Sequence, residues 1–190
     1  DALFETVSGF TTTGATIIPS VEDMPHAVLI WRSATHWIGG MGILVFMLAL
    51  LPATNGSNMQ LMKMESPGPQ VDKLVPKVRE TAAILYKIYI ILTAAQFALL
   101  CLEGMKIFDA INISLATAGT GGYGVLNDSC AAYSPLMQVT IGIFMLLFGV
   151  NFNIYYLIYM KKWKSILGSE ELRAYLIVVA GSVTLIAVNI

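Results

Sequence analysis

The chain has 190 residues, of which 56% are hydrophobic and 12% charged, and its mean hydropathy is +0.72. Soluble domains are about 45 to 50% apolar and about 25% charged, so this excess of apolar residues does not fit one small water-exposed domain. The composition indicates a protein embedded in lipid and argues against a soluble enzyme. Because the formal net charge is −1, no basic surface attracts nucleic acid, and we expect no nucleic-acid partner.

The few metal-binding residue types show no metal-ligand spacing. Cys101 and Cys130 form no CxxC pair, and His26 and His36 belong to no HExxH motif, so we expect neither a transition-metal site nor a disulfide framework. The chain begins at Asp1 without a basic leader and closes inside an apolar run. We therefore expect an internal piece of a longer multi-pass protein.

Long windows without charged side chains predict the membrane-spanning helices. Residues 2–10 are apolar but cover only half a crossing, because a helix rises about 1.5 Å per residue and the hydrocarbon core is about 30 Å thick. Charge-free windows long enough to cross run over residues 33–62 and 129–160. A further window at 81–102 is interrupted only by Lys87, and another begins near 171. The chain thus predicts an all-α polytopic membrane protein with three complete spans and the start of a fourth.

The basic residues set the expected orientation. Eight lysines and arginines lie within or just after two connections, whereas Arg32 and Lys106 lie on the opposite side of the spans. By the positive-inside rule, we expect the connections over residues 52–80 and 161–171 to be cytoplasmic.

Two segments predict re-entrant loops that enter the bilayer from outside and turn back. Between the second and third spans, residues 108–118 are apolar enough for a half-length helix, and the glycine-rich run 119–124 follows. The N-terminal segment has the same plan, because residues 2–10 precede a polar return at 11–16. Non-helical backbone at membrane depth needs partners from protein or water, so a repeated re-entrant loop predicts a pore.

The composition of the two loops suits a monovalent cation. Glycine reaches backbone conformations that aim successive carbonyls inward, threonine adds a hydroxyl oxygen, and neither loop holds a carboxylate for a divalent ion. We expect potassium, as substrate, to bind the loop carbonyls, and we expect no bound cofactor. The candidate ion-binding residues are Thr12, Thr13, Gly14, Ala15, Thr120, Gly121, Gly122 and Tyr123.

Other small and polar residues near the spans are interpreted as packing groups. We expect His36 to form hydrogen bonds between helices, and Asn151 to lie mid-helix and bond a neighbouring helix. Ser134 followed by Pro135 is typical of a helix start. The glycines interpreted as close helix contacts are Gly39, Gly40 and Gly42.

Several sequence runs resemble those of one family. Residues 4–16 read Phe-Glu-Thr-Val-Ser-Gly-Phe-Thr-Thr-Thr-Gly-Ala-Thr, residues 37–42 read Trp-Ile-Gly-Gly-Met-Gly, and residues 66–69 read Ser-Pro-Gly-Pro. Residues 118–124, Ala-Gly-Thr-Gly-Gly-Tyr-Gly, and 148–152, Phe-Gly-Val-Asn-Phe, add a second set. These runs resemble the TrkH branch of the TrkH/KtrB superfamily of bacterial potassium uptake proteins, which carry four helix, pore loop, helix repeats of the potassium-channel-like type in one subunit.

The resemblance implies an organisation into repeats. It assigns residues 1–52 to the pore helix, filter and inner helix of a first repeat, and 53–80 to a cytoplasmic link. Residues 81–160 become a complete second repeat, and 161–190 a cytoplasmic link with the start of a third.

The resemblance also implies the filter glycines, Gly14 and Gly122. In the second loop, Gly119 with Thr117 offers an alternative register, which the sequence leaves open. Neither loop has the full TVGYG filter of potassium channels, so the preference for potassium over sodium stays open as well.

Family membership would place the protein in the bacterial plasma membrane as a homodimer bound to a cytosolic nucleotide-binding subunit of the TrkA/KtrA type. Residues 53–80 are a candidate contact for that subunit, and a plain solvated link is an equal alternative. For the function, potassium uptake is favoured over a dimerising two-pore channel subunit. An intramembrane enzyme is disfavoured, because the spans lack paired carboxylates and a Ser/His arrangement.

Overall fold

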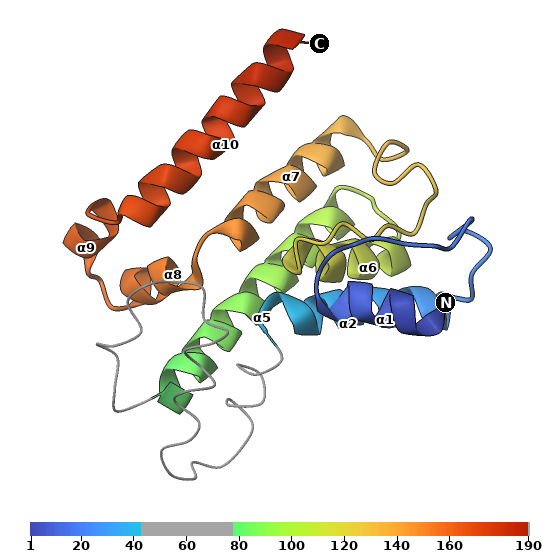
Figure 1. The fold of residues 1–190 in the computed structure, drawn as a ribbon, viewed down its shortest axis with the longest axis horizontal. Coiled ribbons are helices and arrows are strands. Elements are labelled where there is room, and N and C mark those ends of the chain that lie inside the picture. Colours follow the sequence, from blue (N-terminus) through green and yellow to red (C-terminus); the bar gives the residue numbers. More distant parts are fainter. Residues whose placement is uncertain (43–77, 190) are drawn as a thin grey trace. The chain divides into compact units, whose positions relative to one another are not determined.

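The computed structural model describes residues 1–42 and 78–189, and its regular elements in these two stretches are all α-helices (Figure 1). The chain divides into two compact units, Asp1–Gly149 and Val150–Ile190. Each unit is described by itself.

Both half-length helices form where the apolar runs predict them. Helix α1 covers Ala2–Phe10, as expected, and α6 covers Ile107–Ala118, one residue longer than expected at its start. Helix α2 (His26–Gly40) follows α1 and packs against both α1 and α6. The short helix α6 also packs against α5 (Val78–Leu102) and α7 (Pro135–Gly149), so it lies among the helices of the first unit (Figure 1).

Two of the expected spans are confirmed by helix length and composition. The Ala82–Leu102 part of α5 and the Glu170–Val188 part of α10 (Glu170–Asn189) are each long and apolar enough to cross a bilayer. The expected span at 33–62 lies for the most part outside the described residues, because the described part ends at residue 42.

The expected span at 129–160 is not one continuous helix. Helix α7 ends at Gly149, and a separate helix, α8 (Phe152–Tyr159), begins after a break, so only the two together satisfy the length and composition of a span. The break has a local cause: the Asn151 side chain accepts a 2.9 Å hydrogen bond from the Asn153 backbone N–H and caps α8. The expected mid-helix position of Asn151 is therefore wrong.

Asn151 does bond a second helix, as expected. Its Nδ2 donates to both carboxylate oxygens of Glu171 on α10, at 2.9 and 3.0 Å. Helix α9 (Trp163–Leu167) connects α8 to α10 within this second unit.

An apolar cluster from α5, α6 and α7 forms the core around the second half-helix. Ser134 precedes this core at the start of α7, where its Oγ accepts from the Met137 N–H at 3.4 Å, so the expected helix start at Pro135 is confirmed. The buried members of the cluster are Leu100, Met105, Ala110, Ile113, Met137 and Ile141. Their burial fixes α6 against two long helices.

The segments that follow the two loops are fastened to each other. The Asn127 side chain accepts from the Val21 N–H at 2.8 Å, while its backbone N–H donates to Glu22 Oε1 at 2.9 Å. Val21, Leu29 and Val125 are buried together beside these bonds. The two half-helices are thus joined through the segments that follow their loops as well as through α2.

Candidate functional site

Helix α1 ends in a Schellman motif. The Thr12 N–H donates to the Gly9 carbonyl and the Thr13 N–H to the Ser8 carbonyl, both at 3.0 Å. Thr12 itself takes a left-handed conformation with φ +55°. This position usually holds glycine, and a β-branched residue there is strained.

Helix α6 ends in the same way. The Thr120 N–H donates to the Thr117 carbonyl at 2.8 Å and the Gly121 N–H to the Ala116 carbonyl at 3.4 Å. Thr120 has φ +53°, so a strained threonine occupies the equivalent place in both loops.

These conformations align the two loops. Two residues after each left-handed threonine comes a left-handed glycine, Gly14 with φ +72° and Gly122 with φ +81°. Gly119 instead ends α6 in the right-handed region, with φ −77°, and is buried. Of the two registers left open, the backbone therefore pairs Gly122, and not Gly119, with Gly14.

The two loops touch each other directly. Gly14 lies against the backbone carbonyl of Gly121, and a Cβ on Gly14 would overlap that oxygen. The Tyr123 hydroxyl shares its hydrogen between the Ala15 and Glu5 carbonyls, each at 3.2 Å, and Ser8 Oγ donates to the Ala15 carbonyl at 2.6 Å. The Ala15 carbonyl thus already accepts from two protein donors, one for each lone pair.

A buried carboxylate holds the return of the first loop. Glu5 Oε1 accepts from Thr16 Oγ1 at 2.8 Å and from the Ile17 N–H at 2.9 Å. Glu5 Oε2 accepts from Arg32 Nε on α2 at 2.9 Å. Glu5 is 8% and Arg32 4% exposed, so this ion pair lies in the interior, and its charges depend on each other.

Two side chains of α2 hold Tyr123 in place. The Arg32 guanidinium carbon lies 4.1 Å from the centroid of the Tyr123 ring, and the His36 ring centroid lies 3.9 Å from it. Neither ring nitrogen of His36 has a hydrogen-bond partner among the described residues, so the expected interhelical hydrogen bond is wrong. His36 packs against the second loop instead.

Glycines let α2 approach both loops closely. A Cβ on Gly39 would overlap the Phe10 carbonyl oxygen, and one on Gly40 would lie 2.7 Å from Gly119 Cα. The expected packing role is confirmed at these two glycines. A longer side chain at either position would push α2 away from a loop.

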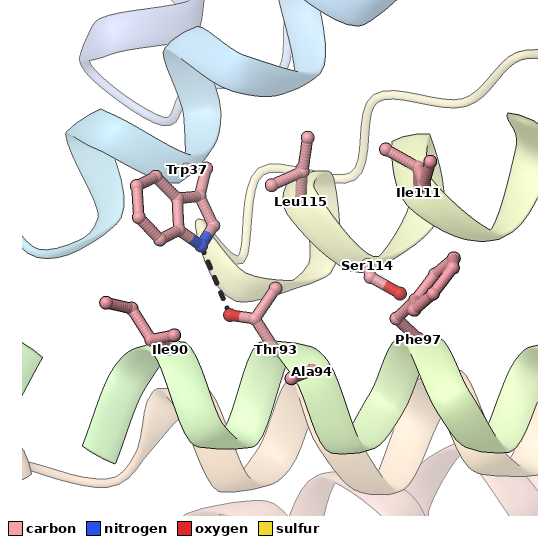
Figure 2. Close-up of a pocket in the computed structure, with 8 residues that line it drawn as sticks. All are labelled: Trp37, Ile90, Thr93, Ala94, Phe97, Ile111, Ser114 and Leu115. Carbon is pink, nitrogen blue, oxygen red and sulfur yellow. Dashed lines mark hydrogen bonds between the residues drawn. The ribbon is translucent and has the colours of Figure 1, made fainter. Parts of the chain in front are cut away.

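A separate pocket of ≈ 240 Å³ lies between α2, α5 and α6 (Figure 2). Across it, Trp37 Nε1 donates to Thr93 Oγ1 at 3.2 Å, and the rest of its surface is almost wholly apolar. None of the candidate ion-binding residues lines it, so it is not the candidate ion path. Its lining residues are Trp37, Ile90, Thr93, Ala94, Phe97, Ile111, Ser114 and Leu115.

The sequence reasoning missed the side chains that support the loops. It counted Arg32 only as an outer basic residue and did not pair it with Glu5. A signal was available, because a charged residue flanked by apolar segments requires a partner when it is buried. No such signal in the sequence marks the partner of Tyr123, whose hydroxyl bonds a residue 108 positions away.

Comparisons with known proteins agree on one family. A family model described as "TrkH: Cation transport protein" matches residues 1–189. The Trk system potassium uptake protein TrkH of Escherichia coli (strain K12) is 40% identical over 177 residues, which cover 92% of this chain and 35% of that protein. TrkG of the same strain is 38% identical over 184 residues, covering 95% of this chain and 38% of that protein.

A solved structure matches as well. The crystal structure of the potassium transporter TrkH from Vibrio parahaemolyticus has a TM-score of 0.66 and 33% identity, covering 85% of this chain and 31% of that one. The expected all-α polytopic membrane fold is thereby confirmed. The chain spans about a third of the length of these relatives.

Replacing Thr120 by glycine is expected to stabilise the protein by about 1 kcal/mol, because glycine removes the left-handed strain of a β-branched residue. The measurement is the midpoint of thermal unfolding of the full-length protein in detergent. Ser129→Gly is the matched control, since Ser129 has φ +56° outside the loop and should give a similar rise. A lower midpoint for Thr120→Gly alone would contradict the strain argument.

Removing one partner of the Glu5–Arg32 pair is expected to lower the free energy of unfolding by about 3 to 5 kcal/mol. The reason is that Arg32→Met leaves a buried carboxylate uncompensated. The double variant Glu5→Gln, Arg32→Met should unfold at a higher temperature than Arg32→Met alone. Thermal unfolding of wild type, both single variants and the double variant completes the cycle. Additive losses would show that the two charges act independently.

Proposed function

We infer the function of this chain from its family, because it belongs to the TrkH family of cation transport proteins. It is a multi-pass protein of the bacterial inner membrane. We propose that its two loops are selectivity filters in a pore through which the whole protein takes up potassium. The observation that carries this proposal is the repeated backbone of the loops, with left-handed Thr12 and Gly14 matched by Thr120 and Gly122.

The repeated backbone suits cation binding through carbonyl oxygens. Alternation between left-handed and other conformations turns the peptide groups so that successive carbonyls can face one side of the chain. Thr120 and Gly122 are exposed, whereas Gly119 is buried against His36, which supports a filter centred on Gly122. The proposed ion-facing residues are Thr12, Thr13, Gly14, Thr120, Gly121 and Gly122.

Ala15 and Tyr123 take a different part in this proposal. The Ala15 carbonyl already accepts from Ser8 and Tyr123, so it holds the loops together rather than facing an ion. The Tyr123 side chain is buried between Arg32 and His36 and supplies this bond from the second loop.

The electrostatics favour a monovalent cation. Both loops follow the C-terminal ends of half-length helices, where the helix dipole carries partial negative charge. The buried carboxylate that holds the first loop, Glu5, is paired with Arg32 and adds no free charge. Carbonyl oxygens and helix ends therefore provide weak negative potential, whereas a divalent ion is usually held by carboxylates.

The proposal extends to the rest of the protein. Relatives named as potassium uptake proteins make a transporter the better interpretation than an intramembrane enzyme or a two-pore channel subunit. We further propose a homodimer bound to a cytosolic nucleotide-binding subunit of the TrkA/KtrA type, with no cofactor held by this chain. The candidate contact at 53–80 falls almost wholly outside the described residues, and the repeat boundaries also remain proposals.

Replacing Gly122 by serine or aspartate in the full-length protein is expected to lower rubidium uptake about tenfold, because the side chain disfavours the left-handed backbone by about 1.4 kcal/mol or more. Transport-deficient cells that carry either variant should also fail to grow when growth depends on potassium uptake. Uptake is measured with labelled rubidium at equal membrane protein levels.

Gly104→Ser is the matched control for Gly122→Ser. Gly104 has φ +92° and open space around it, as Gly122 has, but it lies in the turn between α5 and α6. The control carries similar backbone strain outside the filter and should keep its uptake. Equal uptake in both variants would remove Gly122 from the ion path and with it the filter assignment.

A further inference from the structure

A histidine is buried behind the second loop without a hydrogen bond. His36 on α2 is 0% exposed, and neither Nδ1 nor Nε2 has a partner among the described residues. Burying polar atoms without hydrogen bonds costs free energy. Hydrogen bonding therefore does not account for this residue, and its contacts must be considered instead.

The His36 side chain fills the space behind Gly121. A Cβ on Gly121 would overlap Nε2 and would lie 2.5 Å from Cδ2 and 2.7 Å from Cε1 of the imidazole. The His36 backbone bounds the preceding turn as well, because a Cβ on Gly119 would lie 2.5 Å from its carbonyl oxygen. Two glycines of the second loop thus pack on one residue of α2.

The ring has little freedom to move. Tyr123 lies against it at 3.9 Å between centroids, and Tyr123 is itself held by Arg32 and by its hydroxyl bond to the Ala15 carbonyl. A flat, two-torsion side chain in such a site keeps a defined thickness, unlike a flexible aliphatic chain. The distance between α2 and the Gly121 backbone is therefore set by the imidazole ring.

We propose that His36 is a positioning residue for cation selectivity: its ring is a spacer that sets where the Gly121 carbonyl stands in the second loop. The inference rests on the proposed function, since it assumes that the loop carbonyls bind the ion. A shift in the position of a filter carbonyl changes how well it replaces the hydration shell of a given cation. His36 then acts through Gly121 and does not itself touch the ion.

The geometry predicts that changes at His36 and Gly121 compensate each other. In the full-length protein, His36→Ala opens space behind the loop, and Gly121→Ala forces a methyl group into the ring. In the double variant, the added methyl enters the space that the ring has left. Gly121 has no left-handed φ, so alanine there meets the ring without added backbone strain.

The experiment measures rubidium uptake with and without competing sodium in transport-deficient cells, at equal membrane protein levels. We expect His36→Ala to lower the preference for rubidium over sodium about tenfold and Gly121→Ala to lower uptake about tenfold, each about 1.4 kcal/mol. The double variant should regain at least about threefold in uptake over Gly121→Ala. His26→Ala and Gly142→Ala are the controls, because His26 is exposed and a Cβ on Gly142 would meet nothing within 4 Å.

Two results would overturn the spacer role. One is a rubidium preference in His36→Ala within about twofold of wild type. The other is a double variant whose fold-loss of rubidium uptake equals the product of the fold-losses of uptake in the two single variants. If a single variant does not reach the membrane, the membrane level of the double variant becomes the readout, where recovery supports the spacer and no recovery refutes it. Failure of the proposed function is distinct, because Gly122→Ser would then leave uptake intact.

Discussion

The candidate site depends on one buried ion pair. A carboxylate and a guanidinium in an apolar interior are tolerated only when each neutralises the other and the remaining oxygens find donors. Glu5 meets both conditions through Arg32, Thr16 and the Ile17 N–H. Because these partners come from α1, the returning loop and α2, the pair fixes the position of all three, and Arg32 extends the same constraint to Tyr123 in the second loop.

The two loops reach one backbone geometry by different means. The first loop is held by a charged network, whereas the second is held by aromatic packing of Tyr123 against His36 and Arg32. The two half-helices also differ in length, because α6 has 12 residues and α1 has 9. The side chains that hold the two loops differ, whereas the backbone conformation of the loops is the same.

Much of the fold follows from local patterns in the sequence. Hydropathy and the residue types that end helices place α1, α6 and the long apolar helices to within a few residues. Burial in lipid or in the core demands continuous apolar surface, and this makes such helices recognisable. Hydropathy did not reveal the break before α8, because a cap such as Asn151 ends a helix through one hydrogen bond without changing the apolar content.

The candidate site was less accessible to sequence reasoning. Residue types in the loops predicted their chemistry, but the register of the second loop depended on φ angles that glycine-rich sequence does not determine. The supports of the loops join residues 27 and 108 positions apart, as in Glu5 with Arg32 and Ala15 with Tyr123, and a single sequence carries no record of such pairings.

The bond between Tyr123 and the Ala15 carbonyl has a consequence for how the protein is made. During synthesis, the residues of the first loop are made before Tyr123, so the Ala15 carbonyl lacks this donor until the later segment has been translated. The local hydrogen bonds that end α1 need no part of the second loop, whereas the bond from Tyr123 does. The hydrogen bond between the two loops therefore forms only after translation has passed Tyr123.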